Sequence, residues 1–257
     1  MKAIASTHPA RPARVSRLRG GARVALWCLS LSLVACASGP TANPKDPLEP
    51  MNRSISRFND TVDDYVLKPV STTYRDATPE LVQKGVRNFF NNLSDLWSTV
   101  NNGLQLKGRD TAESLMRFVV NTTVGIYGVF DVATPIGLQR HPEDLGQTLG
   151  HWGVPDGPYL VLPFFGPSTL RDTAAWPADT AMDPVRQHDD VPVRNSAIGL
   201  RTVQKRADLL KATELLGEAS LDKYSFTRDA YLQLRRNQIY DGNPPDEADD
   251  GQTPSTP

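Results

Sequence analysis

Residues 118–170 constrain the fold most, because this segment carries few charges and many residues that interrupt helices. Five of its 53 residues are charged, while glycine and proline recur throughout. Such a segment can neither form one regular helix nor present an ordinary hydrated surface. The sequence therefore predicts that this part of the chain either crosses the core of a globular domain or lies against lipid.

The N-terminus has the features of a secretion signal. Six basic and no acidic side chains accompany a short apolar run over residues 24–35, which is too short to stay as a membrane-spanning anchor. Small residues precede Cys36, so we expect cleavage before this cysteine and attachment of lipid to its thiol, as at the lipobox of bacterial lipoproteins. The alternative is an ordinary signal peptide in which the cysteine occurs by chance.

Loss of residues 1–35 would shift the charge balance of the chain. It would remove six of the 28 basic side chains and none of the 29 acidic ones, leaving a net charge of −7. This balance indicates no role in binding nucleic acid. Cys28 would leave with the signal, and a chain of this length needs no disulfide. No later stretch approaches about eighteen apolar residues, so we expect no conventional transmembrane helix.

Composition divides the predicted mature chain into three zones. Residues 36–50 are small, polar and proline-bearing, which is typical of a tether. Residues 241–257 are acidic and rich in proline and glycine, which predicts a disordered tail. Between them, residues 51–240 show mostly helical periodicity, so we expect one helical domain.

The first predicted helix follows the tether. Its apolar side chains recur at steps of three and four residues, which indicates one face of a core helix. They are Met51, Ile55, Phe58, Val62 and Tyr65. Since proline interrupts helices, we expect this helix to end before Pro69.

Further helices are predicted on both sides of the charge-poor segment. Pro79 followed by an acidic residue is typical of a helix start, and the apolar pattern continues to Leu93. A separate helix is expected over residues 95–106. Asp110 with Glu113 three residues later resembles a capping box that opens the next helix. Three more helices are expected at residues 172–176, opened by Ser168 or Thr169, at 193–216 and at 221–240.

Residues 151–167 predict a hairpin-like loop with two apolar arms. An extended apolar arm follows a cluster of turn-forming residues, and two glycines in that cluster could let the arm pivot as a gate. At membrane depth its backbone amides would need shelter from protein or a cavity. The residues predicted to form this hairpin or gate are Gly153, Pro155, Gly157, Tyr159, Leu162, Phe164 and Phe165.

Motifs for catalysis and for cofactors are missing from the sequence. Residues 166–170 fail the G-x-S-x-G pattern at the last glycine. His141, His151 and His188 have no metal-ligand spacing, and the chain contains no P-loop or dinucleotide fingerprint. We therefore expect no enzyme and no cofactor or metal, with a phospholipase or esterase as the rival hypothesis.

Several different short motifs are spread along residues 46–240, nearly the whole predicted mature chain. They read Asp-Pro-Leu-Glu at 46–49, Asn-Arg at 52–53, Lys-Pro-Val at 68–70, Arg-Asn-Phe-Phe-Asn-Asn-Leu at 87–93, Gly-Gln-Thr-Leu-Gly at 146–150, Gly-Pro-Tyr at 157–159, Leu-Pro at 162–163 and Thr-Leu-Arg-Asp at 169–172. This set resembles the MlaA (VacJ) family of outer-membrane lipoproteins.

The resemblance implies an all-α fold and a role in lipid transport. Its fold would be a ring of amphipathic helices within the inner leaflet of the outer membrane, with an apolar hairpin-like loop beside a central amphipathic channel. Family members sit beside trimeric porins and pass stray outer-leaflet phospholipid to a soluble periplasmic carrier, MlaC. Pro155 departs from the family pattern, because relatives often have a second glycine there. A lipoprotein that only braces a porin is the alternative.

Three arginines are candidates to contact a lipid phosphate, because a guanidinium matches the geometry of phosphate oxygens. They are Arg53, Arg87 and Arg117. The alternative is that each is solvated or held in a structural ion pair. Amphipathic helices bent into a ring would offer a lipid a path with one polar wall and otherwise apolar walls. Movement along such a path would require no catalytic step.

Overall fold

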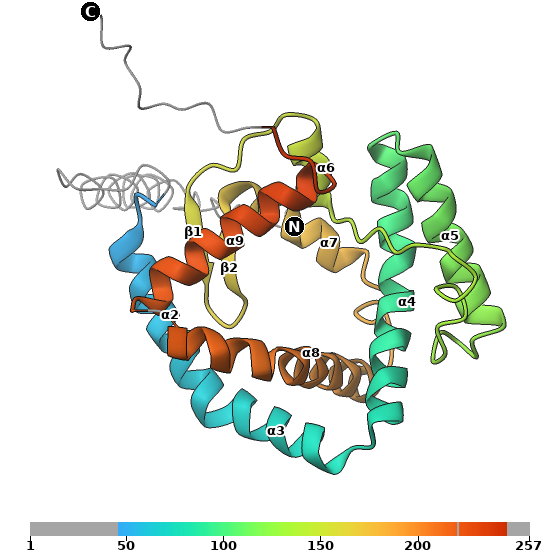
Figure 1. Ribbon diagram of the computed structural model, residues 1–257, viewed down its shortest axis with the longest axis horizontal. Coiled ribbons are helices and arrows are strands. Elements are labelled where there is room, and N and C mark those ends of the chain that lie inside the picture. Colours follow the sequence, from blue (N-terminus) through green and yellow to red (C-terminus); the bar gives the residue numbers. More distant parts are fainter. Residues whose placement is uncertain (1–45, 220, 246–257) are drawn as a thin grey trace, which may run out of the picture. The chain divides into compact units, whose positions relative to one another are not determined.

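The computed structural model describes residues 46–219 and 221–245 (Figure 1). The chain divides into a unit of residues 1–48 and a unit of residues 49–257, and the second unit holds the helices named below. The predicted signal, Cys36, most of the tether and the last twelve residues of the predicted tail lie outside the described residues.

The described part of the second unit is mostly helical, with one two-stranded sheet. Its elements are α2 (Glu49–Val62), a π-helical turn η1 (Asp63–Leu67), α3 (Lys68–Ala77), α4 (Glu80–Leu104), α5 (Gly108–Thr123), α6 (Leu145–His151), β1 (Tyr159–Leu162), β2 (Gly166–Thr169), α7 (Leu170–Ala181), α8 (Val191–Ala219) and α9 (Lys223–Ile239). The two antiparallel strands correct the all-α prediction.

Contacts connect these elements in a closed order (Figure 1). From α3 they run to α8, α4, α6, α9, β2, β1 and α2, and η1 joins α2 back to α3. Helix α5 packs along α4, and α7 packs on α6. At several steps of this order, such as α3 with α8 and α6 with α9, segments far apart in the sequence meet.

The chain does not leave the helical conformation before Pro69, so that prediction is wrong. Instead, the Lys68 amide donates to the carbonyl of Asp63, five residues earlier, and α3 follows directly. Proline lacks an amide hydrogen and its ring crowds the carbonyl four residues before it. A wider π-helical turn just ahead of Pro69 accommodates this by shifting the hydrogen bonding by one residue.

Two other helix predictions need correction. Helix α4 continues through residues 93–95, so the two helices expected there are one. Helix α5 begins at Gly108 without a side-chain cap, and Asp110 lies inside its first turn, so the capping box is wrong. The later helices are confirmed, and the Thr169 hydroxyl accepts from the Asp172 amide at the start of α7.

Polarity is inverted relative to a water-soluble protein. Among the described residues, buried polar and charged side chains outnumber buried apolar ones, and Asn52 of α2 is completely buried. Tyr65 is 81% exposed and Tyr127 is 74% exposed. The face predicted to make α2 a core helix is therefore largely an outer face, with Met51 and Phe58 also exposed. A small apolar cluster joins the hairpin to α9 and consists of Tyr159, Val161 and Tyr224.

Over the described ranges, every helix is too short or too polar to cross a membrane.

Candidate functional site

A polar stripe along α4 packs against the charge-poor loop and α6, and two of its members border the candidate site. Its members recur at steps of four and three residues, the spacing of one helix face. They are Asn91, Asp95, Ser98, Asn102 and Gln105. All but Asn91 are buried. Sequence reasoning missed this stripe, although it follows the same periodicity that identified the apolar faces.

The carboxylate of Asp95 is the charged centre of this stripe. It accepts a 2.8 Å hydrogen bond from Arg140 and lies 3.6 Å from the Arg117 guanidinium. Burial raises the pKa of Asp95, although both arginines favour its charged form. Arg117 also donates to the Leu138 carbonyl at 2.6 Å and to Asp131 at 3.3 Å. These bonds attach the charge-poor loop to α4 and α5.

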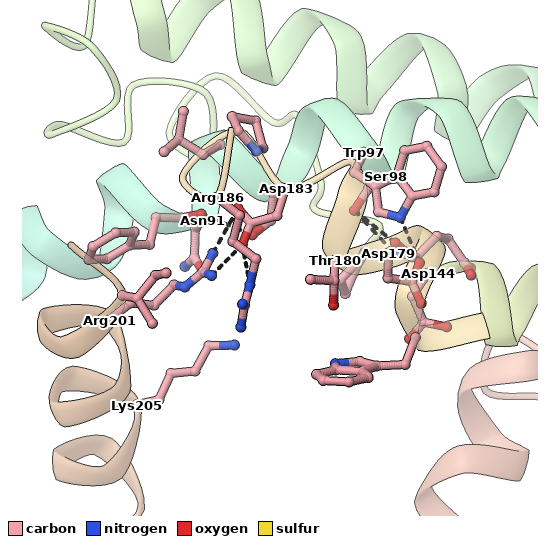
Figure 2. A pocket seen from close by; sticks show the side chains of 18 of the residues that line it. Asn91, Trp97, Ser98, Asp144, Asp179, Thr180, Asp183, Arg186, Arg201 and Lys205 are labelled. Atoms are coloured by element: carbon pink, nitrogen blue, oxygen red, sulfur yellow. Dashed lines mark hydrogen bonds and ion pairs between the residues drawn. The ribbon is translucent and has the colours of Figure 1, made fainter. Parts of the chain in front are cut away.

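A pocket of about 610 Å³ lies beside this stripe and is lined by its members Asn91 and Ser98 and by residues of α6, α7 and α8 (Figure 2). Aromatic rings contribute the apolar part of its lining. The Trp97 ring nitrogen donates to Asp179 at 2.8 Å, and burial raises the pKa of that carboxyl group. Phe165 of the hairpin packs on Trp176 of α7 with ring centroids 4.7 Å apart. The pocket is therefore polar on some sides and apolar on others.

A buried arginine fixes the helices behind the pocket. Arg235 of α9 donates to Asp144 at 2.6 Å and to Asp172 at 2.8 Å, which joins α9 to the starts of α6 and α7. Burial would raise the pKa of Asp172, but the hydrogen bond and charge of Arg235 outweigh it and lower that pKa. The Tyr231 hydroxyl donates to the same carboxylate at 2.9 Å. The three helices are thus held through charged partners rather than through an apolar core.

Two asparagines of α2 hold the hairpin. The Asn52 side chain donates to the Tyr159 carbonyl and accepts from the Val161 amide, both at 2.9 Å. Two turns further along the same face of the helix, Asn59 donates to the Leu162 carbonyl at 2.9 Å and accepts from the Phe164 amide at 2.8 Å. Asn52 and Asn59 thereby pair with backbone groups along the edge of β1 that does not pair with β2.

The predicted hairpin is present, but its arms differ from the prediction. Residues 163–165 form the turn, and the second arm, β2, reads Gly-Pro-Ser-Thr, so only the first arm is apolar. Tyr159 is buried and Leu162 half-buried, whereas Phe164 and Phe165 at the turn are exposed.

The two predicted pivot glycines have left-handed backbones, with φ of +85° at Gly153 and +67° at Gly157. A Cβ on Gly157 would come 3.0 Å from the Cβ of Leu170, whereas one on Gly153 would meet nothing within 4 Å. Pro155 lies between them. The conformation explains why glycine suits both positions, and pivoting stays a prediction.

All three arginines predicted to contact phosphate are paired with carboxylates. Arg53 donates to Asp222 at 2.7 Å, and Arg87 donates to Asp208 at 2.9 Å. Arg117 is buried against Asp95, as described above. Contact with phosphate would require these pairs to open, so it stays a prediction.

A chain with a buried polar stripe, exposed apolar faces and an amphipathic pocket belongs to the class of membrane-associated helical proteins. More specifically, it belongs to the MlaA lipoprotein family, whose model matches residues 44–238.

Named relatives and a solved structure extend this similarity. The chain is 39% identical over 207 residues to the intermembrane phospholipid transport system lipoprotein MlaA of Escherichia coli K12, which covers 78% of this chain and 82% of that one. It is 35% identical over 195 residues to an uncharacterized protein of Rickettsia bellii, 76% of each chain. A solved structure described as the structural basis for maintenance of bacterial outer membrane lipid asymmetry superposes with a TM-score of 0.66 and 35% identity, over 77% of this chain and 99% of that chain.

Proposed function

We propose that the protein is an outer-membrane lipoprotein that removes misplaced phospholipid from the outer leaflet and passes it to a soluble periplasmic carrier. The inverted polarity carries this proposal. Exposed apolar faces suit a chain whose surrounding solvent is lipid, and the polar side chains that line the pocket suit a path for a charged headgroup. Transport along such a path requires no chemistry, in keeping with a family of transport lipoproteins rather than enzymes.

The closed order of contacts supports a ring as the shape of that path. Each element in the order touches the next, and the pocket opens between α4, α6, α7 and α8. In the proposed arrangement the ring lies in the inner leaflet of the outer membrane around an amphipathic channel. The E. coli relative is named for intermembrane phospholipid transport, and the matching solved structure concerns outer-membrane lipid asymmetry.

A trimeric porin and an MlaC-like carrier are the proposed protein partners. The exposed apolar faces give a porin a surface to contact within the membrane, and the carrier would meet the channel on its periplasmic side. Crosslinking in cells followed by affinity purification tests both contacts.

The decisive experiment is replacement of the native relative in a Gram-negative strain that lacks it. We expect the chain to restore resistance to detergent with chelator and to lower the amount of surface phospholipid. Native mass spectrometry of the purified protein should then show bound phospholipid. A protein that only braces a porin would co-purify with the porin but carry no lipid, and free fatty acid released from vesicles would indicate a phospholipase.

Cys36 is the proposed lipid anchor. Cys36→Ala should block both lipid attachment and signal cleavage, because the thiol is the attachment atom. Each acyl methylene adds about 0.8 kcal/mol of membrane affinity, so several chains hold the protein firmly. Mass spectrometry of the mature N-terminus tests this, and any terminus other than acylated Cys36 would overturn it.

The hairpin is proposed to act as a gate beside the channel. Its turn contacts α7 through Phe165 and Trp176, and the left-handed glycines Gly153 and Gly157 precede its first arm. Movement of this arm would change access to the pocket that Phe165 lines.

A further inference from the structure

The pocket contains a cluster of cations that its own carboxylates do not neutralise. Arg201 of α8 donates to Asp183 at 3.1 Å, and Arg186 lies 3.7 Å from the same carboxylate. Lys205 follows Arg201 by four residues, on the same face of α8. Figure 2 shows Arg186, Arg201 and Lys205 directed into the same part of the pocket. Three positive charges thus surround one negative charge.

Lys205 has no carboxylate within ion-pair distance among the described residues. Lys205 is exposed to the open pocket, but the protein around the pocket limits the solvation of its ammonium group. This lowers its pKa, and the nearby charge of Arg201 lowers it further, while Asp183 raises it in part. Such a lysine is held where its own charge is unfavourable, and a bound anion would reverse that effect.

The other carboxylates that line the pocket are engaged elsewhere. Glu143 pairs with Lys107 at 3.1 Å, and Asp144 pairs with Arg235. Asp179 accepts from the Leu145 amide and from Trp97, which are neutral donors, so its charge is not cancelled, but Figure 2 shows it across the pocket from Lys205. The excess positive charge is therefore local to the region of Asp183 and Lys205.

An apolar pocket of about 640 Å³ lies beside the first and shares one residue with it. Phe90 lines both pockets, and the Arg201 guanidinium lies 5.7 Å from the centre of its ring. The second pocket is lined mainly by aliphatic and aromatic side chains of α4, the charge-poor loop and α8. A cationic site next to an apolar one fits an amphiphile with an anionic head.

We propose that Arg186, Arg201 and Lys205 bind the phosphate of a phospholipid, with its acyl chains toward the apolar pocket. In this proposal the excess positive charge selects an anionic headgroup, such as that of phosphatidylglycerol, over the zwitterionic headgroup of phosphatidylethanolamine. This rests on the proposed function and adds a headgroup preference to it. A guanidinium or ammonium group binds phosphate through charge-assisted hydrogen bonds. Asp183 cancels only one of the three positive charges, and the remaining positive charge favours a lipid whose headgroup has no amine to neutralise its phosphate.

The test uses the purified full-length lipoprotein, equilibrated with an equimolar mixture of phosphatidylglycerol and phosphatidylethanolamine and analysed by native mass spectrometry. Lys205→Gln removes the charge while keeping a similar shape, and Lys211→Gln is the control, because Lys211 is exposed on α8 and does not line the pocket. We expect the wild type and Lys211→Gln to prefer phosphatidylglycerol, and Lys205→Gln to lose about tenfold in its retention.

Several outcomes would overturn the proposal. Equal retention of phosphatidylglycerol by wild type and Lys205→Gln would do so, as would equal binding of the two lipids. A separate titration with inorganic phosphate distinguishes a free anion from a headgroup: binding of phosphate without either lipid would mean that the site takes small anions only. Lipid bound without headgroup preference would leave the transport function intact, whereas a protein that binds neither lipid would contradict both.

Discussion

The attachment of the hairpin to α2 gives the sharpest prediction for stability. Asn52 is fully buried and supplies a donor and an acceptor to the backbone of β1. Asn52→Ala would remove two hydrogen bonds of about 1 kcal/mol each and leave the Tyr159 carbonyl and the Val161 amide short of these partners in a buried place. We expect a loss of about 3 kcal/mol in the free energy of unfolding.

Asn59→Ala is the matched control. It removes the same pair of bonds from the turn end of the hairpin, where the Phe164 amide is exposed and water can replace the lost partner. We expect a loss of about 1 kcal/mol. Both variants would be unfolded with urea in detergent micelles, and hydrogen exchange would follow the Val161 amide.

The reasoning fails on either of two results. One is a pair of variants that are destabilised equally, which would mean that burial does not govern the strength of these bonds. The other is a Val161 amide that stays protected in Asn52→Ala, because in the structure this amide faces Asn52.

Three further predictions concern the membrane, pH and the gate. Ile136→Asp, at a site 62% exposed in the charge-poor loop, should destabilise the protein in vesicles by about 2 kcal/mol more than Leu209→Asp, at a site 53% exposed on α8 one turn beyond the pocket-lining Lys205, and equal losses would contradict lipid contact. The pKa of Asp172 is lowered in the folded protein, so its bond to Arg235 stabilises the fold fully above about pH 4 and is lost as the pH falls through the lowered pKa. Wild type should therefore exceed Asp172→Asn in stability to urea by about 3 kcal/mol at neutral pH, and this difference should shrink on acidification. Gly157→Val should impair clearance of surface phospholipid at matched protein levels, and normal clearance would end the gating proposal.

Helical periodicity identified most helices because it depends on local spacing alone. The continuity of α4 was missed although it was readable, because apolar residues recur at helical spacing beyond Leu93, at Leu96, Val100 and Leu104. The sequence also did not indicate that the helix continues through Pro69, because proline ordinarily ends a helix and no simple sequence pattern predicts the π-helical turn. Local rules therefore described the elements better than the junctions between them.

The candidate site was less accessible from sequence, because its partners are distant along the chain. Lys205 belongs to a helix that the sequence presents as charged and solvated, and only the fold brings it near Asp183. The phosphate candidates Arg53 and Arg87 are instead paired with acidic residues more than one hundred positions away. A charge pattern along one helix does not indicate which charges the fold will leave unneutralised.

The inverted polarity changes which positions can vary freely. In the proposed lipid surroundings, hydrocarbon chains have no fixed shape, so an outward-facing side chain such as Tyr65 or Tyr127 needs only to be apolar, and many residues meet that demand. An inward-facing side chain such as Asn52 has particular atoms to satisfy, and few residues can replace it. Among relatives, the usual relation should therefore reverse: the apolar exterior should drift by interchange of greasy residues, while the hydrogen-bonded interior should keep its identities.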